Sequence, residues 1–370
     1  MAGVTAHNGS VVRLDIHEDI RRAWSPPGCF YTDPAIYEEA REKVFPRFWQ
    51  FVADTESVKV PGQAWPFTLL EGSLDEPLLL IRDMDDGLHC LSNVCTHRGN
   101  IVVEGPCVER RLRCRYHGRR FGLDGKFEFM PEFEGCEGFP SEADDLTQIP
   151  LAAWNKFQFV ALNPFCPFEE WAKPMLERMS WLPLREFVFD PLRSKEYLVR
   201  AHWALYVDNY LEAFHIPYVH AGLNEGLDYG AYRYELYRYC NLQLGLGKPG
   251  SEAFELTQDS PEKVETVCAY YWWLFPNTMF NFYPWGLSIN IVRPLALDLT
   301  RVSFLSYIWN PAKLSRGAGG ELDRVEREDE AVVEMVQKGM RSRHFQRGRY
   351  SPKRELGTHH FHRLLAEFMY

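Results

Sequence analysis

Cys95-Thr-His97 and Cys114-Arg-Tyr-His117 are the two motifs from which the organisation of this chain follows. Each motif offers one thiolate and one imidazole from a tight loop, and sixteen residues separate the first motif from the second. Four such ligands would suit a tetrahedral zinc ion, but zinc sites favour Cys-x2-Cys and His-x3–5-His pairs. One Cys and one His in each loop instead favours a [2Fe–2S] cluster, in which one iron takes both Cys and the other takes both His.

The residues around these motifs have the pattern of an all-β domain. Over residues 49–163, short apolar segments such as 65–70 and 157–162 alternate with Gly, Pro and Asp, which indicates strands joined by turns. Before this region, Asp33 followed by Pro34 predicts the N-cap and the first position of a helix.

The two motifs, followed by Phe121 and Leu123-Asp-Gly125, resemble the Rieske domain of the Rieske non-haem iron oxygenases. The resemblance extends over nearly the whole chain from about residue 30. It implies an α+β fold, with an all-β Rieske [2Fe–2S] domain over 49–163 and a helix-grip catalytic domain, an antiparallel sheet with helices, over 164–370. Residues 1–48 would be a segment and helix packing on the catalytic domain. The cluster ligands implied are Cys95, His97, Cys114 and His117.

Position 119 departs from the resembling family. That family usually has Trp directly after the His-Gly pair, whereas this chain has Arg119. The change bears on the cluster potential, on docking of the electron donor or on a subunit contact. It removes no cluster ligand.

The stretch Asn209-Tyr-Leu-Glu-Ala-Phe-His-Ile-Pro-Tyr-Val-His220 contains a second candidate metal set. Apolar residues recur at helical spacing over 203–214, which predicts a helix that carries Glu212 and His215 on one face and stops or kinks at Pro217. In the resembling family, the pattern N-x2-D/E-x2-H-x4-H lies in such a helix. The resemblance therefore makes His215 and His220 ligands of a mononuclear iron(II). It makes Glu212 a bridge to a Rieske His, and it puts Asn209 close to the metal.

A facial triad needs a carboxylate as its third ligand, and Asp329 is the candidate. An apolar helical stripe, with position 329 as its missing member, runs through Leu322, Val325, Val332, Val336 and Met340. A carboxylate on a buried helix face is costly unless it is paired or bound to a metal. The resembling family also places its third ligand eight residues before a Gln, and Gln337 fits that spacing. The neighbouring Glu326, Glu328 and Glu330 are expected to be exposed.

Aromatic residues make up 15% of the chain and concentrate in 270–275 and 280–285, where period-two alternation indicates antiparallel strands. In the resembling family this sheet forms the pocket over the iron, although a plain aromatic core explains about half of these rings. Phe275-Pro-Asn-Thr and residues 209–227 resemble choline monooxygenases and their betaine- and carnitine-oxidising relatives. An aromatic cage would suit a quaternary ammonium group by cation–π attraction. Dioxygenation of an aromatic ring, or O-demethylation of an aromatic compound, is the alternative among oxygenases.

The resemblance implies a terminal oxygenase that uses O2 and electrons from an external reductase, in some systems through a ferredoxin, to hydroxylate or demethylate a small molecule. The chain has no G-x-G-x-x-G fingerprint, so NAD(P)H and flavin are expected on the separate reductase. The family takes the electron from the cluster of a neighbouring subunit, which implies a homotrimer. The alternative from another class is a Rieske electron carrier without oxygenase activity, and the second metal set argues against it.

Composition excludes several other classes. The formal net charge of the 370 residues is −10, and no basic cluster is typical of a nucleic-acid surface. The Arg- and His-rich stretch 341–354 comes nearest and is expected to be solvated. No apolar run approaches the roughly 20 residues of a membrane helix, and the first residues lack the layout of a signal peptide. Nine irregularly spaced cysteines argue against a disulfide framework. We therefore expect a cytoplasmic protein without membrane or nucleic-acid partners.

Overall fold

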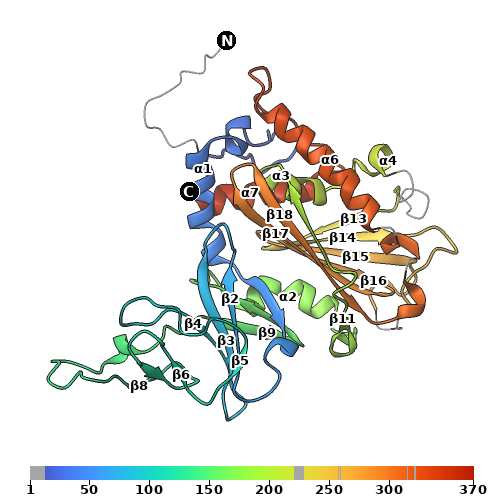
Figure 1. Cartoon of the computed structure of the whole chain (residues 1–370). Helices are drawn as coiled ribbons and strands as arrows, with labels where there is room; N and C mark the ends of the chain where they lie inside the picture. The colour runs from blue at the N-terminus through green and yellow to red at the C-terminus, as the bar shows by residue number, and fades with distance from the viewer. Residues whose placement is uncertain (1–12, 221–228, 257, 259, 315, 321) are drawn as a thin grey trace.

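Small sheets occupy one part of the molecule, and one large sheet with helices around it occupies the other (Figure 1). The structure is a computed structural model that describes residues 13–220, 229–256, 258, 260–314, 316–320 and 322–370. Two sequence predictions fall on residues outside the described ones. These are the absence of a signal peptide at the first residues, and the last part of the 209–227 stretch that resembles choline monooxygenases. The predicted α+β fold class is confirmed.

Strands β1 to β10 form three antiparallel sheets, which we call the small-sheet part. The sheet β4-β3-β2-β5 joins Leu88–Ser92, Glu76–Arg82, Gln63–Leu69 and Cys107–Val108. The sheet β6-β7-β8 joins Leu112–Arg113, Arg120–Phe121 and Phe127–Phe129, and the sheet β1-β10-β9 joins Gln50–Asp54, Phe157–Val160 and Leu151–Trp154. The two Cys/His motifs therefore lie in loops, one after β4 and the other between β6 and β7.

The large-sheet part contains an eight-stranded antiparallel sheet with the order β11-β18-β17-β16-β15-β14-β13, and β12 also pairs with β18. In chain order, β11 to β18 are Val188–Phe189, Lys195–Val199, Arg233–Leu236, Cys240–Leu246, Val267–Leu274, Thr278–Tyr283, Gly286–Ala296 and Leu299–Ile308. The predicted alternation of the aromatic segments holds: Trp272, Phe280 and Phe282 belong to the apolar core, whereas Tyr271 and Tyr283 line a cavity.

Helices cover this sheet, with α6 running across it in Figure 1. The α-helices are α1 (Pro34–Lys43), α2 (Phe168–Arg178), α3 (Trp203–Tyr210), α4 (Ile216–Val219), α6 (Leu322–Met340) and α7 (Leu356–Met369). Short 3-10 helices η1 to η7 span Gly28–Tyr31, Phe45–Arg47, Thr55–Val58, Glu142–Asp144, Leu184–Glu186, Pro311–Lys313 and Gly317–Gly319. Helix α1 begins as predicted, because Asp33 accepts a hydrogen bond from the Ala35 N–H at 2.8 Å and Pro34 occupies the first position.

The helix predicted over 203–214 ends earlier, so the prediction that it carries Glu212 and His215 is wrong. Helix α3 stops at Tyr210. The Glu212 carboxylate accepts the backbone N–H groups of Phe214 and His215, which opens a new short helix, α4, with His215 as its N-cap. Pro217 lies in the first turn of α4, where its missing N–H costs nothing. A turn between two helices, rather than one continuous helix, therefore positions the metal set.

The buried face of α6 differs in phase from the predicted stripe. Asp329, Val333 and Gln337 are buried, at steps of four residues, whereas Val336 is 37% exposed. The apolar pattern missed this face because two of its three buried members are polar. Gln337 is buried because its side chain accepts a hydrogen bond from the His202 N–H at 2.7 Å and donates one to the Tyr31 carbonyl at 3.2 Å.

The prediction that the stretch 341–354 is solvated is only partly right. Arg354 is buried, with its guanidinium 3.8 Å from the centroid of the Tyr229 ring. Arg347 donates hydrogen bonds to the carbonyls of Asp15, Trp24 and Ser25 and holds the N-terminal segment. Among the described residues, no helix has both the length and the apolar character that crossing a membrane requires.

Replacing Gln337 by Met should lower the free energy of unfolding by about 1–3 kcal/mol, because a buried N–H and a buried carbonyl would lose their partners. The midpoint of urea unfolding measures this effect. Lys338→Met, at the exposed neighbouring position, is the matched control and should leave the midpoint unchanged. Equal midpoints for the wild type and Gln337→Met would contradict a stabilising role for this bridge.

Candidate metal centres and substrate cavity

Side chains from two distant parts of the sequence meet where α6 passes the short helix α4. One ligand atom each from His215, His220 and Asp329 lies within 4.8 Å of the others. An Asp329 carboxylate oxygen is 3.0 Å from Nε2 of His220 and 3.4 Å from Nε2 of His215. His220 is 1% exposed. Two imidazoles and one carboxylate in such a group have the composition of the facial triad that binds non-haem iron(II).

The second ring nitrogen of each imidazole, Nδ1, lies within hydrogen-bond distance of a carboxylate. Nδ1 of His215 lies 2.6 Å from Glu212, and Nδ1 of His220 lies 2.7 Å from Glu328. Metal-binding histidines commonly donate the second ring N–H to a carboxylate, which fixes the tautomer and leaves the other nitrogen as the ligand. The donor set therefore fits a metal held through both Nε2 atoms and Asp329.

Electrostatics around His220 favour its interaction with acidic groups. Burial alone would lower the pKa of His220, but the hydrogen bonds and charges of Asp329 and Glu328 outweigh burial and raise it. Asn209 donates a hydrogen bond to Asp329 at 2.8 Å. The structure thus brings together all five residues that were predicted for the mononuclear iron site, namely His215, His220, Glu212, Asn209 and Asp329.

The expectation that Glu326, Glu328 and Glu330 are exposed is wrong, because all three are half-buried. One carboxylate oxygen of Glu330 is buried without a partner among the described residues, and Glu326 and Glu328 have inward roles. Glu328 pairs with His220, and Glu326 accepts a hydrogen bond from the Tyr206 hydroxyl at 2.6 Å. Burial, followed by the negative charge of Asp329, raises the pKa of Glu326 to about 8. A sequence signal was available for Glu326, because residues three apart on a helix share a face. None was available for Glu328, whose partner is 108 residues away.

The metal set forms one wall of a cavity of about 90 Å³. The other lining residues are mostly polar and aromatic, and they include Glu326. The tyrosines of the lining are Tyr206, Tyr210, Tyr232, Tyr271 and Tyr283, and its amides are Asn209, Gln243, Asn281 and Asn290. Sequence reasoning located the strands that supply Tyr271 and Tyr283 but did not identify the tyrosines on α3 or Tyr232.

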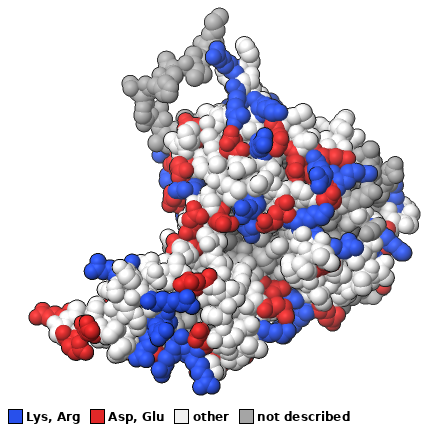
Figure 2. All heavy atoms as spheres, in the orientation of Figure 1, with Lys and Arg blue, Asp and Glu red and all other residues white. Residues whose placement is uncertain are grey.

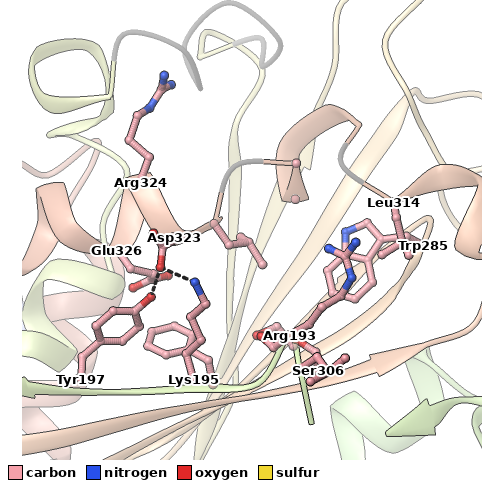
Figure 3. Close-up of a pocket in the computed structure, with 15 residues that line it drawn as sticks. Arg193, Lys195, Tyr197, Trp285, Ser306, Leu314, Asp323, Arg324 and Glu326 are labelled. Atoms are coloured by element: carbon pink, nitrogen blue, oxygen red, sulfur yellow. Dashed lines mark hydrogen bonds and ion pairs between the residues drawn. The ribbon is translucent and has the colours of Figure 1, made fainter. Parts of the chain in front are cut away.

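A larger cavity of about 500 Å³ adjoins this one and shares Leu322 and Glu326 with it. Figure 3 shows Lys195 and Tyr197 of β12 converging on Asp323 at the start of α6. Their hydrogen bonds hold the pKa of Asp323 well below its usual range. These contacts join β12 to the start of α6, and none of the three residues of the metal set lines the larger cavity.

The Cys/His set lies in the small-sheet part. Cys95 and Cys114 are buried, and the rings of His97 and His117 lie with their centroids 4.8 Å apart. Nδ1 of His97 is buried without a hydrogen-bond partner among the described residues, as expected for an atom that would bind iron. An amide N–H of Asn100 points to the Cys114 sulfur at 3.7 Å. Two buried thiols and two adjacent imidazoles fit a [2Fe–2S] cluster with mixed ligands.

Arg119 is 2% exposed, so it makes no direct contact with a docking protein or a subunit. Its guanidinium lies 5.0 Å from the Phe127 ring centroid and forms an ion pair with Asp144 at 2.5 Å. The Asp144 carbonyl accepts a hydrogen bond from the hydroxyl of Thr96, which lies between Cys95 and His97. This burial favours the first of the three predicted consequences, a shift of the cluster potential, which stays a prediction.

Family comparisons match both parts of the chain. Residues 48–140 match the Rieske [2Fe-2S] domain, and residues 178–370, more than half of the chain, match the ring hydroxylating alpha subunit (catalytic domain).

Two curated relatives cover almost the whole chain. Choline monooxygenase (chloroplastic) of Arabidopsis thaliana is 29% identical over 96% of this chain and 85% of its own length. The carnitine monooxygenase oxygenase subunit of Escherichia coli K12 is 28% identical over 94% of each.

Two solved structures have the same fold. A quaternary ammonium Rieske monooxygenase, described with carnitine oxidation and inter-subunit electron transfer, has a TM-score of 0.78 and 22% identity over 98% of this chain and 100% of its own. Naphthalene 1,2-dioxygenase from Rhodococcus sp. has a TM-score of 0.71 and 17% identity over 93% of this chain and 94% of its own.

Asp329→Ala should abolish binding of the mononuclear metal and leave the cluster in place, because only one of the two donor sets loses a ligand. Iron and acid-labile sulfide assays should give three irons and two sulfides per wild-type chain, and two of each per variant chain. The visible absorption of the cluster should not change. Glu330→Ala, one position along α6, is the control. Full retention of iron in Asp329→Ala would refute the ligand role.

Proposed function

The chain belongs to the Rieske non-haem iron oxygenases of the ring hydroxylating alpha subunit family, and we propose that it oxidises a quaternary ammonium compound at an iron held by His215, His220 and Asp329. It is the oxygenase component of a multicomponent system and uses O2 and electrons supplied by a reductase or ferredoxin. Because the catalytic family model matches the chain, the alternative of a Rieske electron carrier without oxygenase activity falls away.

The observation that carries the substrate proposal is the carboxylate of Glu326 in a cavity lined by five tyrosines. Among the described residues, Glu326 accepts a hydrogen bond from the Tyr206 hydroxyl but forms no ion pair with a Lys or Arg. A quaternary ammonium group would supply a positive charge here, and tyrosine rings attract such cations through their faces. The curated relatives named above are choline and carnitine monooxygenases, which supports the same substrate class.

Aromatic ring dioxygenation and aromatic O-demethylation are less well supported by this cavity. An uncharged arene would bring no positive charge to Glu326, and it would cover the polar side chains of Asn281 and Asn290 without adding hydrogen bonds, which is costly. The likeness to naphthalene 1,2-dioxygenase concerns the fold. We therefore prefer monooxygenation of the cationic substrate, by hydroxylation or demethylation.

The side chains have separate tasks in this proposal. Cys95, His97, Cys114 and His117 hold the cluster, and the triad holds the mononuclear iron. When bound, the cluster supplies single electrons and the iron activates O2 for attack on a substrate C–H bond. Glu328 orients His220, Asn209 orients Asp329, and Glu326 with the tyrosines holds the cationic group of the substrate beside the triad.

Glu212 is proposed as the link through which the electron reaches the iron site, since its carboxylate contacts His215 at 2.6 Å. In Figure 1, strands β6 and β8 lie at one end of the molecule, and helices α4 and α6 lie at the other. The cluster of a neighbouring subunit would lie nearer to Glu212 than the cluster of the same chain does. His117 is exposed and could make this contact between subunits. We accordingly propose a homotrimer in which each Glu212 faces the neighbour's cluster.

The domain limits 1–48, 49–163 and 164–370 remain proposals. Strand pairing supports the limits of the middle domain. Its first strand, β1, pairs with its last strand, β10, so residues 49–163 form a closed unit. A cytoplasmic location also stays a prediction, and the plant relatives are named as chloroplastic.

Glu326→Gln should raise KM for choline at least tenfold, about 1.4 kcal/mol of lost binding, because the amide cannot compensate the ammonium charge. Oxygen consumption with a matched reductase measures KM for choline and for its uncharged isostere, 3,3-dimethyl-1-butanol. KM for the isostere should be unaffected, and Glu330→Gln should behave as wild type. Equal loss of binding for both compounds would contradict recognition of the charge.

Glu212→Ala should keep both metals but stop turnover, because His215 loses the carboxylate that links it to the electron source. Glu212 also accepts two backbone N–H groups, so Glu212→Gln, which keeps an acceptor there, separates folding of the turn from electron transfer. Both variants should show wild-type iron content and a cluster that stays reduced in the presence of O2 and substrate. Normal turnover in either variant would refute the link.

A further inference from the structure

One surface of the small-sheet part has a charge opposite to that of the whole protein. Six of the eleven residues from Arg110 to Arg120 are arginines and none is acidic, whereas the chain carries a net charge of −10. This stretch is denser in basic residues than 341–354, so the expectation that 341–354 comes nearest to a basic cluster is wrong. Figure 2 shows Lys and Arg gathered along the lower edge of this part of the molecule.

Strand pairing and a groove bring these arginines together. Arg113 on β6 is the register partner of Arg120 on β7. Arg111 and Arg115 line the same groove of about 370 Å³ as these two residues. We call Arg110, Arg111, Arg113, Arg115 and Arg120 the basic surface. It flanks the loop that carries Cys114 and His117, so a protein bound here would lie close to the cluster.

The basic surface has few intramolecular counter-charges. Arg110 and Arg113 are exposed and form no ion pair within the described part of the chain. Among the described residues, Arg111 pairs with Glu128 at 3.2 Å and Arg115 with Glu104 at 3.4 Å, and Glu109 is the other acidic residue that lines the groove. Exposed pairs of this kind contribute little, so the positive potential of the surface is available to a partner.

Exposed apolar side chains accompany the arginines. Tyr116 is 63% exposed and its ring centroid lies 3.7 Å from that of His117, while Val108, beside the groove, is 65% exposed. Aromatic and arginine side chains are enriched in protein–protein interfaces. The composition of the basic surface therefore suits a protein partner better than a small anion.

The opposite side of the Cys/His set is acidic. The loop 131–145 holds six acidic residues and no Lys or Arg, and Asp and Glu colour the outer tip of this part in Figure 2. Phe133 of this loop packs on His97, with ring centroids 5.5 Å apart. An acidic protein would be attracted to the basic surface and repelled by the loop, which sets its orientation.

We propose that the basic surface is the docking site of the electron donor, and that the donor is an acidic redox protein. The inference rests on the proposed function, which requires a donor, and it adds where the donor binds and which charge it carries. In each encounter one electron leaves the donor and enters the cluster. Complementary charge accelerates such encounters and makes their rate depend on salt.

The test is reduction of the cluster by a pre-reduced plant-type [2Fe–2S] ferredoxin of strongly negative net charge, followed by stopped-flow absorption without substrate. Arg110→Glu/Arg113→Glu should slow the second-order rate at least tenfold at low salt. The difference should shrink in 0.5 M NaCl, where the Debye length falls below about 5 Å. Arg343→Glu, which reverses an exposed charge outside the small-sheet part, should stay within about twofold of wild type.

Two controls separate docking from other effects. Reduction by dithionite should be as complete in the double variant as in wild type, which shows an intact cluster. Sedimentation should give the same mass for both proteins. An unchanged ferredoxin rate would overturn the proposal, and so would a loss of subunit association, which would make the surface a contact between copies. Because substrate and turnover are absent, failure of the substrate proposal would not affect this readout.

Discussion

The buried carboxylate of Asp329 is the constraint on which the catalytic half of the molecule depends. A carboxylate on the inner face of α6 is stable there only if it is paired. The structure pairs it with Asn209 at 2.8 Å and with His220 at 3.0 Å. These contacts join α6 to the end of α3 and to the turn that follows it. The same requirement orders the surroundings, since Glu328 and Glu212 each bind the second nitrogen of one imidazole.

Several acidic groups around two histidines form an arrangement that suits a cation. Glu212, Glu326 and Glu328 lie around the metal set, which itself contains Asp329, and the two imidazoles alone cannot compensate these four acidic groups. An iron(II) ion would offset part of this charge, and a cationic substrate beside Glu326 would offset more. The small-sheet part has the opposite polarity on its basic surface. One chain thus presents a negative cavity to its substrate and a positive surface to its electron source.

The local consequences of burial explain where sequence reasoning went wrong. A helix was expected to continue through Glu212 because the apolar spacing continues to residue 214. The carboxylate of Glu212 instead bonds to the backbone N–H groups of the next turn, and such local side-chain bonds compete with helix propagation. Likewise, Glu326 and Glu328 lie in an acidic run typical of a solvated face. Their partners, Tyr206 and His220, come from another segment that the run itself does not reveal.

The sequence by itself determined the class of the two metal sets. Spacing within short loops places Cys95 with His97 and Cys114 with His117 in any fold that keeps those loops. The predicted stripe included position 329, but only the structure showed that α6 buries Asp329 together with Val333 and Gln337. Tertiary structure alone decided which groups meet across long separations in the chain. Glu328 and His220 are 108 residues apart, and the tyrosines of the cavity come from α3, from β15 and β16 and from Tyr232 before β13. Such contacts depend on how α6 packs across the sheet, which local periodicity does not encode.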